Sequence, residues 1–297
     1  MSPEKKVVVE EVSGWLRVYD DGSVDRTWTG PPEVKFLVTP VPQSGEFING
    51  VATRDFAINT STTGLPVRIY KPEMEVGQET KLPIFLHFHG GGFCMSRANW
   101  YMYHQFYTKL VSSVQAVCVS VEFRLAPEHR LPAAIDDCHT ALIWLSSVAR
   151  SELSESWFTD VADFGKVFLI GDSTGGNIVH QVASRAASST GEMSPLRVAG
   201  GVLIHPGFVR AERSKSELVV KPDPFLTLDM VDKFLAMALP EGSTKDHPVT
   251  CPMGPAAPSL AELKLPPFLV AVAQNDPDTA IQTELLIQTI SNFTKRH

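Results

Sequence analysis

The segment Lys166–His180, KVFLIGDSTGGNIVH, constrains the fold of this chain more than any other stretch. The apolar run Val167–Ile170 predicts a buried strand, and the residues after Gly175 predict a helix. Between them, Gly171-Asp172-Ser173-Thr174-Gly175 places a serine on the turn from strand to helix. Such a G-x-S-x-G turn is strained and exposes the serine hydroxyl, and a Cβ at either flanking position would crowd it. The segment therefore predicts that Ser173 is a nucleophile.

A second motif lies upstream, at the end of another predicted strand. The stretch LPIFLHFHGGGF contains the strand Leu82–His89, followed by Gly90, Gly91 and Gly92. A glycine loop of this kind supplies backbone N–H groups that bind an oxyanion, the negative oxygen of an acyl-transfer intermediate. His89 is expected to hold this loop by a side-chain hydrogen bond rather than to act as a base. Together, the two motifs predict acyl-transfer chemistry.

A nucleophilic serine needs a base, and in this motif order the acid and the base both follow the serine. The acid candidate is Asp276, which comes soon after the predicted strand Pro267–Ala273. Only one histidine follows it, His297, and the other eight precede it. Because chain termini fray, His297 is a poor candidate for the base. Another histidine, His205, closes a predicted strand and either contacts substrate or packs.

Composition and charge exclude several classes of protein. The 297 residues are 43% hydrophobic and 20% charged, as in an ordinary globular protein with a large core. A net charge of −7 and the lack of a basic run argue against a nucleic-acid surface. The N-terminal residues lack the apolar core of a secretory signal, and no apolar stretch reaches the ~18 residues of a membrane span. The four cysteines show no C-x-x-C spacing, so we expect free thiols in the cytoplasm, or also in the nucleus.

Strand-like and helix-like segments alternate along the chain, which predicts a mostly parallel sheet with helices on both faces. The remaining predicted strands are Ala52–Asn59, Pro66–Tyr70, Ala116–Phe123 and Val198–His205, and the predicted helices are Tyr101–Val114, Pro132–Ala149, Gly175–Ala187 and Thr279–Lys295. The first two strands are expected to form a hairpin with its turn at Ser61–Gly64. Residues 1–45 and about 207–250 lack strand periodicity. They are expected to cap the site within one domain, 1–297.

Several stretches resemble the plant carboxylesterases of the hormone-sensitive-lipase type, a family that has the α/β-hydrolase fold and includes the gibberellin receptor. They are HGGGF at His89–Phe93, FRLAPEHRLPAAIDD at Phe123–Asp137, GDSTGGN at Gly171–Asn177, DHPVTCPMGP at Asp246–Pro255 and LPPFLVAVAQND at Leu265–Asp276. The N-terminal GWLRVYDDGSVDRTW is similar to the cap-forming arm of the family.

The resemblance implies a role for each candidate residue. Ser173 corresponds to the nucleophile and Asp276 to the acid of the catalytic triad. The backbone N–H groups of three residues would bind the oxyanion, namely Gly91, Gly92 and Thr174. Asp172 and His89 are expected to support these groups from behind.

One departure from the family pattern bears on function. In the family, a further helix, a strand and a loop with the catalytic histidine follow the acid. Here Asp276 runs almost directly into the helix Thr279–Lys295. An internal deletion of roughly 30 residues is the simplest account, since that is the average length of a helix, a strand and their loops. The sheet would then lack its last strand and the helix that precedes it.

Two functional interpretations stay open. The first is a carboxylic ester hydrolase that acts on a small-molecule ester and is weakened by the loss of the catalytic histidine. The second is an inactive homologue that keeps the pocket and the cap and binds a small, hormone-like ligand. We expect neither a cofactor nor a metal ion, and neither a nucleic acid nor a membrane as partner. A homodimer is an expected consequence of the sheet edge that the missing strand would expose.

Overall fold

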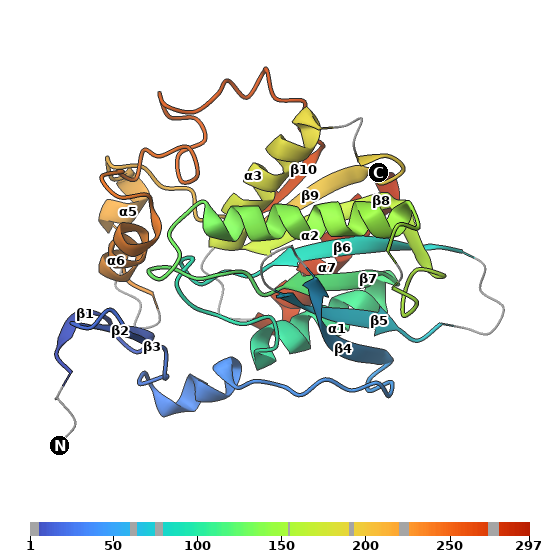
Figure 1. Cartoon of the computed structure of the whole chain (residues 1–297), viewed down its shortest axis with the longest axis horizontal. Coiled ribbons are helices and arrows are strands. Elements are labelled where there is room, and N and C mark those ends of the chain that lie inside the picture. Colours follow the sequence, from blue (N-terminus) through green and yellow to red (C-terminus); the bar gives the residue numbers. More distant parts are fainter. Residues whose placement is uncertain are drawn as a thin grey trace.

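The structure is a computed structural model that describes residues 6–59, 64–74, 80–153, 155–189, 193–219, 226–272 and 279–297. At the centre of this part of the chain is a seven-stranded sheet in the order β10-β9-β8-β6-β7-β5-β4 (Figure 1). The five strands from β10 to β7 are parallel, and β5 is antiparallel to both of its neighbours. The strands are β4 (Val51–Asn59), β5 (Gly64–Pro72), β6 (Leu82–Phe88), β7 (Val117–Val121), β8 (Ala162–Asp172), β9 (Val198–Ile204) and β10 (Phe268–Ala271).

Helices cover both faces of the sheet, as the alternation of segments predicted, because neighbouring strand residues point to opposite faces. In β6, Ile84 and Leu86 belong to the core that α2 and α3 cover, whereas Phe85 belongs to the core under α1 and α7. All four helices begin and end within one residue of the predicted bounds. They are α1 (Tyr101–Val114), α2 (Ala133–Ala149), α3 (Thr174–Ser188) and α7 (Thr279–Arg296).

The predicted hairpin is present, since β4 and β5 pair along their whole length in antiparallel register. Residues 60–63, which include most of its predicted turn, lie outside the described residues.

The N-terminal residues form a small sheet that the sequence pattern did not predict. Here β1 (Val8–Val12), β2 (Leu16–Tyr19) and β3 (Val24–Asp25) pair in antiparallel fashion, and the short helix η1 (Pro32–Val38) follows. The strands have only two to five residues, and most residues of β1 are exposed. Strands this short carry little readable alternation of apolar and polar residues, which explains why residues 1–45 show no strand periodicity in the sequence.

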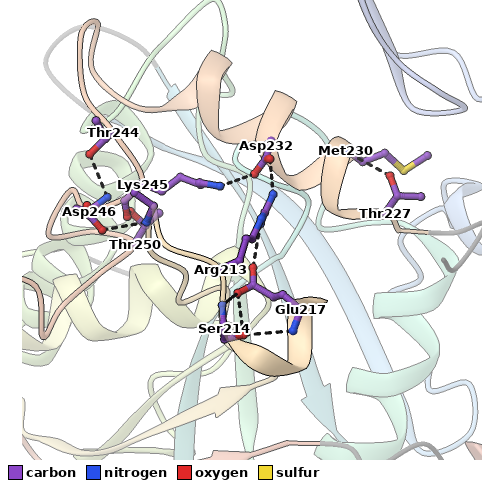
Figure 2. A network of polar contacts seen from close by, with 11 residues as sticks. Arg213, Ser214, Glu217, Thr227, Met230, Asp232, Thr244, Lys245, Asp246 and Thr250 are labelled. Carbon is purple, nitrogen blue, oxygen red and sulfur yellow. Dashed lines mark hydrogen bonds and ion pairs between the residues drawn. The ribbon is translucent and has the colours of Figure 1, made fainter. Parts of the chain in front are cut away.

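A polar network holds together the segment that contains α5 (Lys215–Val219) and α6 (Leu228–Ala238) (Figure 2). Asp232 of α6 lies at its centre, because its carboxylate accepts hydrogen bonds from Arg213 and from Lys245. Figure 1 shows α5 and α6 at the same end of the molecule as β1, β2 and β3, and α6 contacts β1. Two segments far apart in the sequence, the N-terminal arm and the segment before β10, therefore lie side by side.

β10 is the edge strand of the sheet, and its outer side has no partner strand within the described ranges. Val270 and Val272 are 53% and 75% exposed. The segment Pro266–Ala273 carries no charge. An uncharged, apolar edge presents unpaired backbone groups to which another chain can add.

We expect the substitution Val270→Lys to reduce self-association, because a charge on an edge strand opposes pairing with a second strand. Light scattering over a range of protein concentrations measures this. Val219→Lys is the matched control, since Val219 is 80% exposed on α5, away from the edge, and this variant should associate as the parent does. Equal association of Val270→Lys and the parent would contradict the prediction.

Candidate active site

Ser173 lies on the turn between β8 and α3 in a strained conformation. Its φ of 49° and ψ of −123° belong to a region that residues with a side chain rarely adopt. Three backbone hydrogen bonds of 2.9 Å hold this turn. Ser173 N donates to the Ile204 carbonyl, and the Ser173 carbonyl accepts from the N–H groups of Gly176 and Gly207. The turn is thus fixed against β9 and the loop after it, at the carboxyl edge of the sheet.

The turn Gly171–Gly175, which we call the elbow, packs directly on the end of β6. A Cβ at Gly171 or at Gly175 would overlap the carbonyl oxygen of Phe88, the last residue of β6. A Cβ at Gly90 would come within 3.1 Å of Ser173 Cβ. The structure therefore brings the two sequence motifs together, and the glycines permit an approach that no side chain would allow.

The glycine loop keeps its outward hydrogen-bond donors free. Gly91 has a φ of 108° and Gly92 a φ of 63°, conformations that favour glycine. The Gly91 carbonyl accepts from the N–H groups of Cys94 and Met95, which curls the loop. Within the described ranges, no hydrogen bond uses the N–H of Gly91 or of Gly92. The Phe234 ring of α6 lies against Gly92, so α6 covers this loop.

The Asp172 carboxylate joins the elbow to the glycine loop from behind. Asp172 Oδ1 accepts from Gly90 N at 3.1 Å, and Oδ2 accepts from the Tyr103 hydroxyl at 3.2 Å. His87 Nε2 is 3.7 Å from Oδ1, and His87 Nδ1 is 2.7 Å from the Ser120 hydroxyl. The motif pointed to Asp172. Sequence reasoning missed Tyr103 of α1 and His87 of β6, and the signal available for His87 was a polar side chain within an otherwise apolar strand.

His89 lies in the core beneath the glycine loop. Its Nδ1 is 2.8 Å from the Gly90 carbonyl oxygen, and its ring stacks on Phe123 with 4.1 Å between ring centroids. Burial lowers the pKa of His89 to about 4, and burial also lowers the pKa of His87. Both imidazoles are therefore neutral at pH 7 and serve as uncharged supports for the loop.

Within the described ranges, no hydrogen bond joins the Ser173 hydroxyl to a histidine. The His297 carbonyl accepts from Arg197 at the start of β9. Ser173, in contrast, is bonded to Ile204 at the other end of that strand, about 20 Å away. The exposed His205 follows β9 with a φ of 45°.

The predicted acid, Asp276, belongs to residues 273–278, which lie outside the described residues. Thr174, the third predicted oxyanion donor, is the first residue of α3 and is buried beside the elbow. In the described part of the chain, no three His, Cys, Asp or Glu side chains gather as a set of metal ligands. None of the described helices combines the length and the apolar character that a membrane span needs.

The comparisons with known proteins identify the class of fold. A family model described as alpha/beta hydrolase fold matches residues 85–285. An esterase of Pyrobaculum calidifontis is 27% identical, with a TM-score of 0.60 over 86% of this chain and 75% of its own. An arylesterase of 23% identity has the same TM-score over 88% of this chain and 75% of its own. The fold is therefore that of the α/β hydrolases.

Similar plant enzymes identify the family within this fold. Probable carboxylesterase 6 of Arabidopsis thaliana is 38% identical over 83% of this chain and 70% of its own length. Tuliposide A-converting enzyme 1 of Tulipa gesneriana is 34% identical over 91% of this chain. The chain spans 64% of the length of that enzyme. It belongs to the plant carboxylesterases of the hormone-sensitive-lipase type, as the sequence motifs predicted.

The pKa of His89 predicts a loss of stability in acid. The unfolded chain has a histidine pKa of about 6.5, so below that pH it binds the proton more readily than the folded chain does. The free energy of unfolding is unaffected well above pH 6.5. It falls as the pH drops from 6.5 towards the folded pKa of about 4, by about 3 kcal/mol for this group.

Urea unfolding at several pH values between 4.5 and 7.5 tests this prediction. In this range, His89→Gln should lower the pH slope of the unfolding free energy by up to about one proton, whatever its effect on absolute stability. His129→Gln is the control because His129 is exposed, and it should keep the parent slope. An unchanged slope in His89→Gln would show that His89 takes up its proton equally in both states.

Proposed function

We propose that this chain is a serine carboxylesterase that acts on a small-molecule ester. The observation that carries the proposal is the strained Ser173 turn, packed on the end of the strand whose following loop has free N–H groups at Gly91 and Gly92. A hydroxyl on such a turn is exposed to an incoming carbonyl group. The carboxylesterase relatives support the same chemistry.

In the proposed reaction, the Ser173 Oγ attacks the carbonyl carbon of the ester. The N–H groups of Gly91, Gly92 and Thr174 donate to the oxyanion that forms. The alcohol then leaves with a proton, and water releases the acid from the acylated serine. The preorganised donors lower the barrier without a change of geometry during the reaction.

Removal of the Ser173 hydroxyl proton is the step of this scheme that lacks an identified base. Asp276 would orient a histidine base, but the sequence has none after Asp276 except His297. Enzymes that lose triad members retain roughly 10³–10⁴-fold catalysis over water, from the oxyanion donors and substrate binding. We therefore propose a slow esterase and infer that the histidine-bearing segment has been deleted after Asp276.

We further propose that residues 1–45 and about 207–250 cap the site of a single domain. The contact of Phe234 with Gly92, and the hydrogen bond from the Lys233 side chain to the Glu11 carbonyl, support this arrangement. The substrate or ligand would be small enough to fit under such a cap. A cytoplasmic or also nuclear location remains our proposal, as does the lack of nucleic-acid and membrane partners.

The alternative is a catalytically inactive homologue that binds a small, hormone-like molecule. The missing base favours it, since the pocket elements do not depend on that histidine. The two proposals differ in the fate of an ester, which the first cleaves and the second only binds.

The substitution Ser173→Ala tests the nucleophile. The parent should hydrolyse p-nitrophenyl acetate slowly, because a serine hydroxyl without a base is a weak nucleophile, and Ser173→Ala should abolish this turnover. A fluorophosphonate should also add its mass once to the parent and not to Ser173→Ala. Ser188→Ala, at an exposed serine on the same helix, should behave as the parent. Turnover that survives Ser173→Ala would refute the assignment, and a parent without turnover or labelling would favour the binding protein.

Restoring the base tests the deletion. We expect that a helix, a strand and a histidine loop from a related carboxylesterase, inserted after Asp276, will raise turnover at least about 100-fold, the usual minimum contribution of a general base. The thermal midpoint should rise as well, because β10 gains a partner strand. The same insertion with its histidine replaced by alanine separates the two effects. If the complete insertion improved neither turnover nor the thermal midpoint, the inference that a segment has been deleted after Asp276 would be wrong.

A further inference from the structure

A cavity of about 560 Å³ lies between the N-terminal arm and the segment that follows the glycine loop. Its apolar walls come from Trp15, Trp28, Trp100 and Phe123, and from Met95 directly after the loop. Neither Ser173 nor any residue of Gly90–Gly92 lines it. The cavity is thus separate from the proposed catalytic site, and its size is within the usual range for small-molecule sites.

Hydrogen bonds hold the walls of this cavity in place. Arg26, on the N-terminal arm (blue in Figure 1), donates from Nε to the Cys94 carbonyl at 2.6 Å and from Nη2 to the Ala126 carbonyl at 2.9 Å. Its guanidinium also pairs with Glu128. The arm is therefore fastened to the segment after the glycine loop and to the loop after β7. A cavity with walls already fixed loses little conformational entropy when a ligand enters.

The aromatic walls suit a flat ring system. The Trp15 and Trp28 rings meet edge to face, with centroids 4.5 Å apart. Trp28 is oriented by a hydrogen bond of 3.1 Å from its indole nitrogen to the Pro31 carbonyl. Aromatic rings held in such an edge-to-face arrangement can contact a further ring by stacking or through its edge.

The charge of the lining selects an anion. Three cations line the cavity, Arg26, Lys35 and Arg97, against one carboxylate, Glu122. Arg97 pairs with Glu122 at 3.1 Å, and Arg26 pairs with a carboxylate outside the lining. Lys35 has no ion pair within the described ranges. One positive charge thus remains uncompensated at the cavity, on a protein with a net charge of −7.

We propose that this cavity binds a planar aromatic carboxylate. The ring system would lie among the indoles, and the carboxylate would lie towards Lys35. This function is additional to ester hydrolysis, because it uses neither the elbow nor the N–H groups of the glycine loop. A neutral aromatic molecule of the same shape would lose the interaction with Lys35, and a cationic one would be repelled.

Isothermal titration calorimetry with three isosteric probes tests the proposal. We expect 2-naphthoate to bind to one site per chain, about tenfold more tightly than the neutral 2-naphthylmethanol, as a single favourable charge pair allows. The cationic 2-naphthylmethylammonium should bind most weakly. Equal affinities for all three probes, or no binding of 2-naphthoate, would overturn the proposal.

Three variants and one control variant locate the bound probe. Lys35→Glu should weaken 2-naphthoate about tenfold or more and leave 2-naphthylmethanol unchanged, whereas Lys215→Glu makes the same charge change at an exposed lysine of α5 and should alter neither. Trp28→Ala should weaken both probes. Ser173→Ala should bind both as the parent does. If Ser173→Ala abolished binding, or Lys35→Glu had no effect, the probe would occupy another site and the proposal would be wrong.

Discussion

The close approach of two backbone segments, at the ends of β6 and β8, is the constraint on which the rest of the site depends. The carbonyl oxygen of Phe88 occupies the space where a side chain at Gly171 or Gly175 would lie. The turn between these glycines keeps Ser173 at a φ of 49°, a conformation that costs about 1–3 kcal/mol and persists only where the surroundings enforce it. The bond from Ser173 N to the end of β9 supplies part of that enforcement. Parallel strands, fixed by their cores on both faces, thus hold the serine where the proposed chemistry needs it.

Polar groups behind this turn link a histidine and a tyrosine of the core to the glycine loop. His87, Tyr103 and the Gly90 N–H surround the Asp172 carboxylate, so the one charge in this cluster has several donors or near neighbours. The histidines remain neutral because burial depresses their pKa values. One ring nitrogen of each histidine, Nε2 of His87 and of His89, has no hydrogen-bond partner among the described residues, whereas removing a donor to Asp172 would leave a partly buried carboxylate with fewer partners, which costs free energy. The network therefore fixes the position of the glycine loop through the polar interior and not only through packing.

The elements that were predictable from the sequence are those with a local signal. Long apolar runs marked the strands of the sheet, and glycines at fixed offsets marked the elbow and the glycine loop. The contacts that complete the site join residues remote in sequence, such as Asp172 with Tyr103, or Phe234 with Gly92, and no periodicity reports such pairs. The N-terminal strands were not predicted for another reason, because strands of two to five residues are too short to show a readable alternation. The same holds for Arg26, whose role depends on carbonyl groups about 70 and 100 residues away.

The parts of the proposed mechanism differ in how far they depend on the end of the chain. The backbone hydrogen bonds that shape the elbow and the glycine loop use no residue after Gly207 in the described part of the chain, whereas α7 packs on the core beneath β8 and β9. The motif order places both the acid and the base after the serine, and the acid candidate Asp276 itself follows β10. The proposed scheme thus places the proton-transfer groups after β10 and the oxyanion donors before β9 in the sequence. A change in the proton-transfer groups would therefore slow the proposed cleavage without altering Ser173 or the donors that would contact the bound carbonyl group.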